Sequence, residues 1–340
     1  SYGMHKNSHF KTVVAIDFNE KAADTFKKNM PDTEVIVGDI TDDKTKDRII
    51  TESKLKGVNM IIGGPPCQGF SMKGKKLGLN DPRNFLFMEY LNLVQEIQPE
   101  VFVIENVKSL LNTAGGWFKD EILNYIHKLG YKVQYGVLNA KKFGVPQARE
   151  RAIFICSKHK DITLPKGTES IVTVRDAISD LAYLQSAEGE FEQEYITAPE
   201  TEYQKFMRKG SKHLYNHKAS AHSEKALEKL AMIPAEKGKE CLPEELWGKQ
   251  KFNTTWGRLV WDEVSPTIDT RFDTPSNGTN SHPELNRAIT PREAARIQSF
   301  DDNFVFYGSK FYIRSQIGNA VPPLLAEAIA DRIWEMYRNE

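Results

Sequence analysis

The chain has 340 residues, of which 40% are hydrophobic and 27% are charged, so it is long enough to bury a substantial core. Its cysteines, Cys67, Cys156 and Cys241, are too few for a disulfide framework and lack the spacing of a zinc site. No run approaches the roughly 18 consecutive apolar residues that span a bilayer, and no secretory leader is expected. The sequence therefore predicts a cytoplasmic protein without a metal site or membrane contact.

The charges balance, because 46 Lys and Arg residues face 46 Asp and Glu residues. A protein that binds nucleic acid normally contacts phosphates through Lys and Arg, but a zero net charge can conceal local segregation. Basic residues gather in 141–160 and 205–225, and acidic residues gather in 188–202. Most such runs are solvated faces, so charge alone neither supports nor excludes a nucleic-acid partner.

The first 160 residues alternate short apolar runs with amphipathic ones. The pattern predicts strands at 13–16, 35–37, 60–62, 101–104, 133–138 and 152–155, and helices at 19–28, 86–97 and 117–129. This alternation is typical of a doubly wound α/β sheet, in which ligands bind beyond the carboxyl ends of the strands.

Beyond residue 160 the periodicity weakens, and acidic runs, basic runs and turn residues are mixed. We expect a first domain over 1–160 and a second, smaller and irregular domain over 161–305. An amphipathic helix at 324–337 indicates that the segment 306–340 returns to the first domain.

A Gly-Gly-Pro-Pro-Cys-Gln-Gly-Phe-Ser sequence at 63–71 directly follows one expected strand. Its prolines restrict the loop that carries Cys67, and a free thiol with a pKa of about 8.5 is an intrinsically good nucleophile. A lone cysteine in a tight turn is more often a small buried residue. The flanking prolines and the motifs described next favour the nucleophile.

Two further motifs lie at strand ends. Glu105-Asn106-Val107 follows the expected strand 101–104, and Glu105 should lie close to the neighbouring strand end that bears Cys67, although such an acid is by itself usually a solvated cap. Arg149 and Arg151 are two residues apart and share one face if the chain is extended there. Paired guanidinium groups suit phosphate or base oxygens, with surface ion pairing as the alternative.

The fourth signal lies near the end of the chain. Thr290 followed by Pro291 is a standard helix start, with threonine as the cap and proline at the first helical position. A Gly-Asn-Ala-Val-Pro turn at 318–322 precedes the last helix and would present its backbone to a cofactor. Taken separately, a capped surface helix and an ordinary turn explain both pieces.

Together, and in this order, these signals resemble motifs IV, VI, VIII, IX and X of the DNA (cytosine-5)-methyltransferase family of the bacterial restriction-modification type. The resemblance covers most of the chain outside its middle region. It implies a Rossmann-like, S-adenosylmethionine-dependent sheet with a smaller target recognition domain. It also implies methyl transfer to C5 of a cytosine flipped out of a specific duplex DNA sequence, through a covalent bond between Cys67 and cytosine C6.

The resemblance also implies roles for individual residues. Glu105 would bind and protonate cytosine N3, and Arg151 together with Arg149 would hold the pyrimidine oxygen and the active-site loop. The implied cofactor-binding residues, beginning with Asp17 for the ribose and Phe18 for the adenine, are Asp17, Phe18, Asp39, Ile40, Pro66, Leu86, Asn319 and Val321. The implied DNA-binding residues are Ser71, Lys73, Arg258, Thr267, Arg271 and Asn277.

One departure concerns the start of the chain. The family's Phe-x-Gly-x-Gly-Gly loop, which holds the methionine end of the cofactor, would precede Ser1, and we expect it to be missing from this sequence by truncation. A companion polypeptide that supplies the loop, or its true loss, are the alternatives.

The resemblance further implies a monomer that acts on double-stranded DNA and has a cognate restriction endonuclease as its functional partner. Two other functions compete with this one. A tRNA cytosine-5 methyltransferase is disfavoured because the Cys-Phe-Thr signature of that branch is missing from the sequence. A non-catalytic DNA-binding or regulatory subunit is disfavoured because Cys67, Glu105 and Arg151 are all retained.

Overall fold

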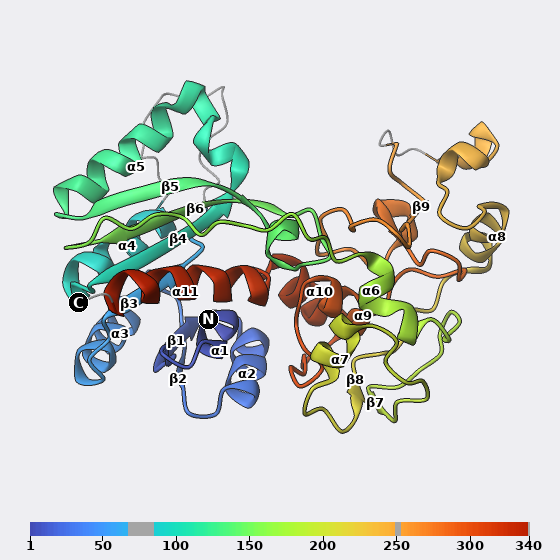
Figure 1. Ribbon diagram of the computed structural model, residues 1–340, viewed down its shortest axis with the longest axis horizontal. Helices are drawn as coiled ribbons and strands as arrows, with labels where there is room; N and C mark the ends of the chain where they lie inside the picture. Colours follow the sequence, from blue (N-terminus) through green and yellow to red (C-terminus); the bar gives the residue numbers. More distant parts are fainter. Residues whose placement is uncertain (67–84, 249–252, 339–340) are drawn as a thin grey trace. The chain divides into compact units, whose positions relative to one another are not determined.

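The computed structural model describes residues 1–66, 85–248 and 253–338, and Figure 1 labels their helices and strands. The chain forms two compact units. Unit 1 comprises Ser1–Asn139, Glu150–Gly167 and Ala326–Glu340, and unit 2 comprises Ala140–Arg149 and Thr168–Leu325. Unit 2 thus includes residues 140–149 and 306–325, which the sequence pattern had assigned to the first domain.

Unit 1 begins with helix α1 (Tyr2–Lys6) and a pair of parallel strands, β1 (Val14–Asp17) and β2 (Glu34–Val37). Helix α2 (Glu20–Asn29) connects them, and its first turn is capped by the side chain of Asn19, which accepts hydrogen bonds from two backbone N–H groups. Helix α3 (Asp43–Leu55) follows β2. The two predicted strands and the capped helix are therefore present.

The main sheet of unit 1 has the strand order β3-β4-β6-β5. Its strands are β3 (Met60–Gly63), β4 (Val101–Val107), β5 (Lys132–Asn139) and β6 (Glu150–Ser157). Strand β3 is parallel to β4, whereas β6 is antiparallel to both β4 and β5. Only residues 140–149 join β5 to β6, and a parallel crossover needs about a dozen residues or more. The expected doubly wound sheet is therefore a mixed α/β sheet in which β6 runs antiparallel between β4 and the edge strand β5.

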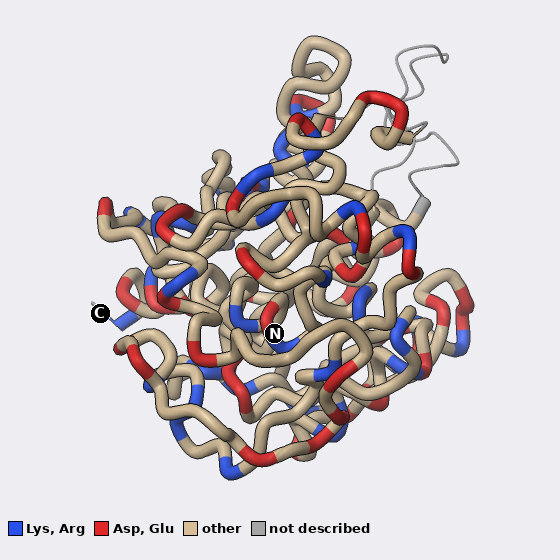
Figure 2. The backbone as a smooth tube through the Cα atoms, turned by 90° about the vertical axis from the view of Figure 1, so that its right-hand side faces the viewer, with Lys and Arg blue, Asp and Glu red and all other residues tan. Residues whose placement is uncertain are grey.

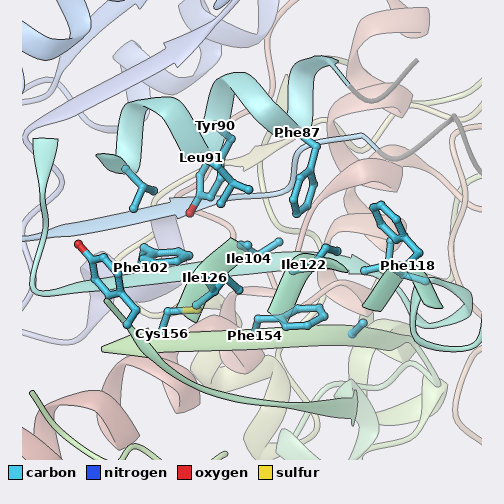
Figure 3. Packing of buried hydrophobic residues seen from close by; sticks show 14 residues of the cluster. Phe87, Tyr90, Leu91, Phe102, Ile104, Phe118, Ile122, Ile126, Phe154 and Cys156 are labelled. Atoms are coloured by element: carbon cyan, nitrogen blue, oxygen red, sulfur yellow. The ribbon is translucent and has the colours of Figure 1, made fainter. Parts of the chain in front are cut away.

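Helices α4 (Phe85–Ile97) and α5 (Trp117–Lys128) pack on one face of this sheet (Figure 3). The core between them consists largely of aromatic and β-branched side chains from α4, β4, α5 and β6, among them Phe87, Tyr90, Phe102, Ile104, Phe118, Ile122, Ile126 and Phe154. Cys156 belongs to the same core, and burial raises the pKa of its thiol well above the ordinary value. Cys156 is thus a packing residue and not a reactive one.

The opposite face of the sheet is covered as well, because the alternate residues Val103, Ile153 and Ile155 are also buried. The last helix, α11 (Pro323–Arg338), begins in unit 2 and continues into unit 1. Near its end the hydroxyl of Tyr337 lies 2.9 Å from that of Ser157 at the end of β6. The described residues contain no helix long and apolar enough to cross a membrane.

Unit 2 contains short elements separated by long irregular segments. Its helices are α6 (Val174–Ile178), α7 (Glu202–Arg208), α8 (Glu224–Met232), α9 (Pro291–Ile297) and α10 (Lys310–Asn319). Its strands are β7 (Glu192–Gln193), β8 (Leu214–Tyr215), β9 (Gly257–Arg258) and β10 (Thr279–Ser281). Helix α9 begins as predicted, with Thr290 as the cap and Pro291 in the first turn; the Thr290 hydroxyl accepts from the backbone N–H of Glu293, whose carboxylate accepts from the backbone N–H of Thr290.

Buried ion pairs hold unit 2 together where regular structure is sparse. The guanidinium group of Arg287 binds both carboxylate oxygens of Glu293 at 2.7 Å, and Arg296 bridges Asp302 and Asp180. Burial by itself would raise the pKa of Glu293, but Arg287 lowers it below the usual range. Removing one partner of such a buried pair typically costs about 3–5 kcal/mol, because the other charge remains uncompensated.

The same core contains a histidine that makes stability depend on pH. His217 is buried, and its Nδ1 lies 3.0 Å from Oγ1 of Thr290. Burial lowers the pKa of His217 to about 3, whereas the unfolded chain takes up this proton near its ordinary pKa of about 6.5. Stability contributed by the neutral imidazole is therefore present at pH 7 and is lost as the pH falls below about 6.5.

We predict that lowering the pH from 7 to 5 reduces the free energy of unfolding by about 2 kcal/mol through His217 alone. The loss should be smaller by about this amount in His217→Gln, and urea unfolding of both proteins at the two pH values measures it. The pKa of His282 is also lowered by burial, but His282 is present in both proteins. Its contribution to the loss of stability therefore cancels in the comparison. Equal losses in the two proteins would contradict the prediction.

Candidate active site

A glutamate carboxylate lies where strands β3 and β4 end. The parallel ladder finishes with Gly63 opposite Ile104, so the next residues along the two strands are Gly64 and Glu105. A Cβ atom added to Gly64 would lie only 2.9 Å from Oε2 of Glu105. Glycine at this position lets the carboxylate approach the backbone of the loop that leads to Cys67.

Strand β6 supplies the cation beside this carboxylate. Nε of Arg151 lies 2.8 Å from Oε1 of Glu105, and both side chains are largely buried, with 15% and 19% of their surfaces exposed. Glu105 is opposite Ile153 and Val107 is opposite Arg151, so Arg151 occupies the diagonal position on the face that bears Glu105. Long side chains at diagonal positions of an antiparallel pair can reach each other. The structure thus brings together two of the predicted catalytic residues.

Asn106, between Glu105 and Val107, makes a contact for which the sequence analysis had assigned no role. Its side-chain Nδ2 donates a 2.9 Å hydrogen bond to the carbonyl oxygen of Pro65, and its Oδ1 accepts from the backbone N–H of Val107. The available signal was an amide side chain next to Glu105, where the apolar run of β4 ends.

The predicted nucleophile itself lies outside the described residues, as do Ser71 and Lys73. The described chain reaches Pro66, which is exposed, immediately before Cys67 in the sequence. The preceding Pro65 is buried. The described part of the site therefore consists of the strand ends and the loop residues that precede Cys67.

The expected pairing of Arg149 with Arg151 on one extended face is corrected by the structure. Arg149 precedes β6, and its side chain is only 2% exposed within unit 2. Its guanidinium group donates hydrogen bonds to the carbonyl oxygens of Ile268 and Gly318, at 3.1 and 2.9 Å. Arg149 therefore joins two backbone segments of unit 2.

Gln147 makes similar connections. Its Oε1 accepts from the backbone N–H of Ile268, and its Nε2 donates to Oε1 of Gln298 at 3.0 Å. The Gln-Ala-Arg segment thus pins the backbone around Ile268 to that around Gly318. A Cβ atom at Gly318 would lie 2.5 Å from the carbonyl group of Asp269, so glycine is required for this close approach.

Residues predicted to bind the cofactor lie at the carboxyl ends of β1 and β2. Asp17 ends β1 and accepts a 2.8 Å hydrogen bond from the backbone N–H of Asn19, while burial raises its pKa. The next residue, Phe18, is 78% exposed. Beyond β2, Asp39 is exposed and accepts hydrogen bonds from the backbone N–H and hydroxyl group of Thr41, which lower the pKa of its carboxyl group.

This arrangement fits a nucleoside. Because β1 and β2 are parallel, Asp17, Phe18 and Asp39 follow strand ends at the same sheet edge. Carboxylates accept hydrogen bonds from ribose hydroxyl groups, and an exposed aromatic ring can pack on a purine. Within the described residues no cluster of His, Cys, Asp or Glu fits a metal ion.

The other predicted cofactor residues are placed as follows. Ile40 and Leu86 are partly buried in unit 1, Leu86 in the first turn of α4. Asn319 and Val321 belong to unit 2, where Asn319 is exposed and its Nδ2 lies 3.2 Å from Oγ of Ser315. The cofactor-binding roles of these four residues therefore stay predictions.

The predicted DNA-binding residue Arg258 is used inside unit 2. It is 3% exposed, and its guanidinium group donates hydrogen bonds to the carbonyl oxygens of Leu230, Ile233, His282 and Leu285 and to the side chain of Asn286. These contacts anchor the carboxyl end of α8, so Arg258 is a buried structural residue in this structure.

The remaining predicted DNA contacts are more accessible. Thr267 and Arg271 are exposed, and Thr267 donates to the carbonyl oxygen of Ala148 at 2.9 Å. Asn277 is partly buried and donates to a carboxylate oxygen of Asp269 at 2.9 Å. Figure 2 shows basic and acidic residues interspersed along the chain.

A mixed α/β sheet, together with a parallel strand pair whose carboxyl ends carry two carboxylates and an exposed phenylalanine, is typical of a Rossmann-like domain suited to a nucleoside-containing cofactor. Residues 1–335 match the sequence model of the family described as C-5 cytosine-specific DNA methylase. The chain therefore belongs to this family, and it is an S-adenosylmethionine-dependent DNA (cytosine-5)-methyltransferase.

The names of similar proteins agree with this family assignment. The Type II methyltransferase M1.HphI of Haemophilus parahaemolyticus is 36% identical over 341 residues, which cover 97% of this chain and 82% of that protein. The Type II methyltransferase M.DdeI of Desulfomicrobium norvegicum is 37% identical over 368 residues, covering 100% and 86%. A prophage-encoded E. coli protein assigned as a DNA modification methyltransferase has the same fold, with a TM-score of 0.78, 24% identity and coverage of 100% and 96%.

We predict that Gly64→Ala slows methyl transfer to DNA by about tenfold or more, because the added methyl group displaces the Glu105 carboxylate. Gly64 is exposed, so the melting temperature should change little. Initial rates of label transfer from S-adenosylmethionine at saturating DNA measure the effect.

Gly238→Ala is the matched control, because its added Cβ would lie 2.7 Å from Oε2 of another glutamate, Glu240, in unit 2. Its rate should remain close to that of the unmodified enzyme. Equal rates for the two variants would contradict a specific role for the space at Gly64.

Proposed function

We propose that this methyltransferase modifies a cytosine within one short duplex DNA sequence, with Cys67 as the nucleophile and with Glu105 and Arg151 acting on the base. The observation that supports this assignment most strongly is the 2.8 Å ion pair between Arg151 and Glu105, with Oε2 of Glu105 facing Gly64. Gly64 lies three residues before Cys67 in the sequence.

The chemistry explains why a thiol and a carboxyl group are needed together. C5 of cytosine is a poor nucleophile, and addition of the Cys67 thiolate to C6 converts the ring into an enamine whose C5 is electron-rich. Glu105, through Oε2, binds N3 and supplies a proton there as electron density builds on the ring. Arg151 orients the carboxyl group and contacts the pyrimidine oxygen. After transfer, loss of the C5 proton expels the thiolate and restores the aromatic base.

S-adenosylmethionine supplies the electrophilic methyl group when it is bound. We assign Asp17 to the ribose hydroxyl groups, Phe18 to the face of the adenine and Asp39 with Ile40 to its edge. Leu86 packs on the same ligand. The exposed ring of Phe18 supports this assignment, because a large apolar side chain beside two carboxylates has a clear use in binding a nucleoside.

The target recognition domain is proposed to span 161–305, of which 168–305 belong to unit 2, with Thr267, Arg271 and Asn277 near the DNA. Ser71 and Lys73 are assigned to the DNA backbone or the flipped base. A cytosine stacked in a duplex must be extruded before it can react, at a cost of a few kcal/mol. Interaction with the duplex must offset this cost.

The relatives named Type II methyltransferases support a place in a restriction-modification system. We therefore propose a cognate restriction endonuclease that recognises the same sequence, and a monomeric enzyme that acts in the cytoplasm. The family described as C-5 cytosine-specific DNA methylase also supports DNA as the substrate in preference to tRNA.

Two substitutions test the catalytic assignment. Cys67→Ser should abolish turnover while duplex binding persists, and Glu105→Gln should slow transfer by about 100-fold or more with near-normal cofactor affinity. Label transfer and equilibrium binding are measured for both variants. Cys241→Ser, at an exposed free cysteine, is the control and should behave as the unmodified enzyme. Full activity in Cys67→Ser would refute the mechanism.

A second test concerns DNA affinity. Arg271→Ala should weaken duplex binding and lower the slope of log affinity against log salt concentration by about one, as expected for the loss of one phosphate contact. Arg48→Ala removes an equal charge from an exposed ion pair with Glu34 in unit 1 and should leave the slope unchanged. Identical slopes for the two variants would exclude Arg271 from the phosphate contacts.

A further inference from the structure

We propose that Asn106 is a positioning residue for the methyl-transfer reaction. Its buried side-chain amide fixes the backbone at Pro65, two residues before Cys67, against the strand end that carries Glu105. The inference rests on the proposed roles of Cys67 and Glu105, and it adds a residue that those roles do not include.

The contact is well defined. Asn106 is 8% exposed, Pro65 is buried, and the hydrogen bond from Nδ2 to the carbonyl oxygen of Pro65 measures 2.9 Å. Across the sheet Asn106 is opposite Ala152, whose small side chain leaves room on this face. The backbone N–H of Val107 donates to Oδ1 at 2.9 Å, so donor and acceptor of the amide are both used.

The two prolines explain why a side chain is required here. Strands β3 and β4 pair through backbone hydrogen bonds up to Gly63 and Ile104. Beyond this point Pro65 and Pro66 have no N–H groups, so the segment cannot donate to the ladder. The amide of Asn106 instead binds a carbonyl group that the segment still offers. It thereby continues the attachment of the loop to β4 where the regular ladder must stop.

The neighbouring contacts leave little freedom on the β3 side. The hydroxyl group of Tyr90 in α4 donates to the carbonyl oxygen of Val103 at 3.0 Å, and a Cβ atom at Gly63 would lie 2.4 Å from the Tyr90 ring. The chain is therefore held by helix α4 up to Gly63 and by Asn106 at Pro65. Loss of the Asn106 amide donor would release the chain at Pro65, whereas the contacts of α4 at Gly63 would remain.

Release at Pro65 would change the separation between the attacking sulfur and the carboxyl group that assists it. A displacement of about 1 Å in reacting groups costs on the order of 100-fold in rate. Apart from Pro66, Ser71 and Lys73, the residues assigned to cofactor and DNA lie outside this segment, so both affinities should be affected much less. The expected signature is a loss in the rate of base activation without an equal loss in affinity.

A buried amide can also serve only to stabilise the fold, and unit 2 offers such a case. Asn216 is buried, its Nδ2 donates to the carbonyl oxygen of Phe306 at 2.9 Å, and its Oδ1 accepts from the N–H of Phe306 at 2.9 Å. Asn216→Asp therefore makes the same chemical change as Asn106→Asp. Both keep the acceptor and the shape of the side chain and remove the donor.

The experiment measures base activation separately from methyl transfer. DNA carrying tritium at C5 of cytosine, from cells without cytosine methylation, is incubated with enzyme and S-adenosylhomocysteine. Addition of the thiolate to C6 makes C5 nucleophilic; C5 then takes a proton from water, releases its tritium to water and expels the thiolate. Tritium release thus reports adduct formation with no net change in the base.

Rates are measured at saturating DNA, per folded protein, for the unmodified enzyme, Asn106→Asp, Asn216→Asp and Cys67→Ser. Asn106→Ala, which buries no charge, is measured in parallel below the melting temperatures of all variants. We expect tritium release to fall by about tenfold or more in both Asn106 variants, with DNA and S-adenosylhomocysteine affinities within about twofold. Asn216→Asp should retain the unmodified rate.

Release rates in both Asn106 variants that match Asn216→Asp would overturn the positioning role, and so would equal losses of rate and of both affinities. If only Cys67→Ser loses release, the proposed function stands and the role of Asn106 falls. Release that persists in Cys67→Ser would overturn the proposed function and the positioning role with it.

Discussion

The antiparallel pairing of β6 with β4 is the constraint on which the candidate site depends. This register places Arg151 diagonal to Glu105 and on the same face, where their side chains meet at 2.8 Å. A slip of one residue would move Arg151 to the opposite face. The register is held from the other end of β6, where Phe154 and Cys156 are buried in the core with α5 (Figure 3). Packing in the apolar core therefore positions the charged pair.

In the sheet, backbone hydrogen bonds between strands join neighbouring segments of the chain. Elsewhere in the molecule, buried polar side chains join such segments. Asn106 attaches a proline-containing loop that cannot join the ladder, and Arg149 joins two backbone segments of unit 2 through their carbonyl groups. Arg258 and the buried pairs of Arg287 and Arg296 serve the same purpose where helices are short. Several of the chain's most polar residues are thus structural, because buried carbonyl and carboxyl groups need partners.

Much of unit 1 could be predicted from the sequence, because its strands are short apolar runs and its helices begin and end with clear signals. Helix α3 was not predicted, because its sequence is largely charged and only Ile49 and Ser53 are buried. The antiparallel direction of β6 was missed because periodicity carries no information on strand direction. At the site, Glu105 and Arg151 came together as their motifs implied. Arg149 and Arg258 did not behave as expected, since the carbonyl groups that bind them come from residues distant in sequence.

Attack on a cytosine by Cys67 beside the Glu105–Arg151 pair would leave a covalent adduct that can be trapped. Duplex DNA containing 5-fluorocytosine is incubated with enzyme and S-adenosylmethionine, because fluorine cannot leave C5 as a cation and the covalent bond persists. Digestion and mass spectrometry then identify the attached peptide. We expect one modified peptide, which contains Cys67 and carries a methylated fluorocytosine nucleotide. Attachment at Cys241 or another residue, or methyl transfer to ordinary DNA without any trapped adduct, would contradict it.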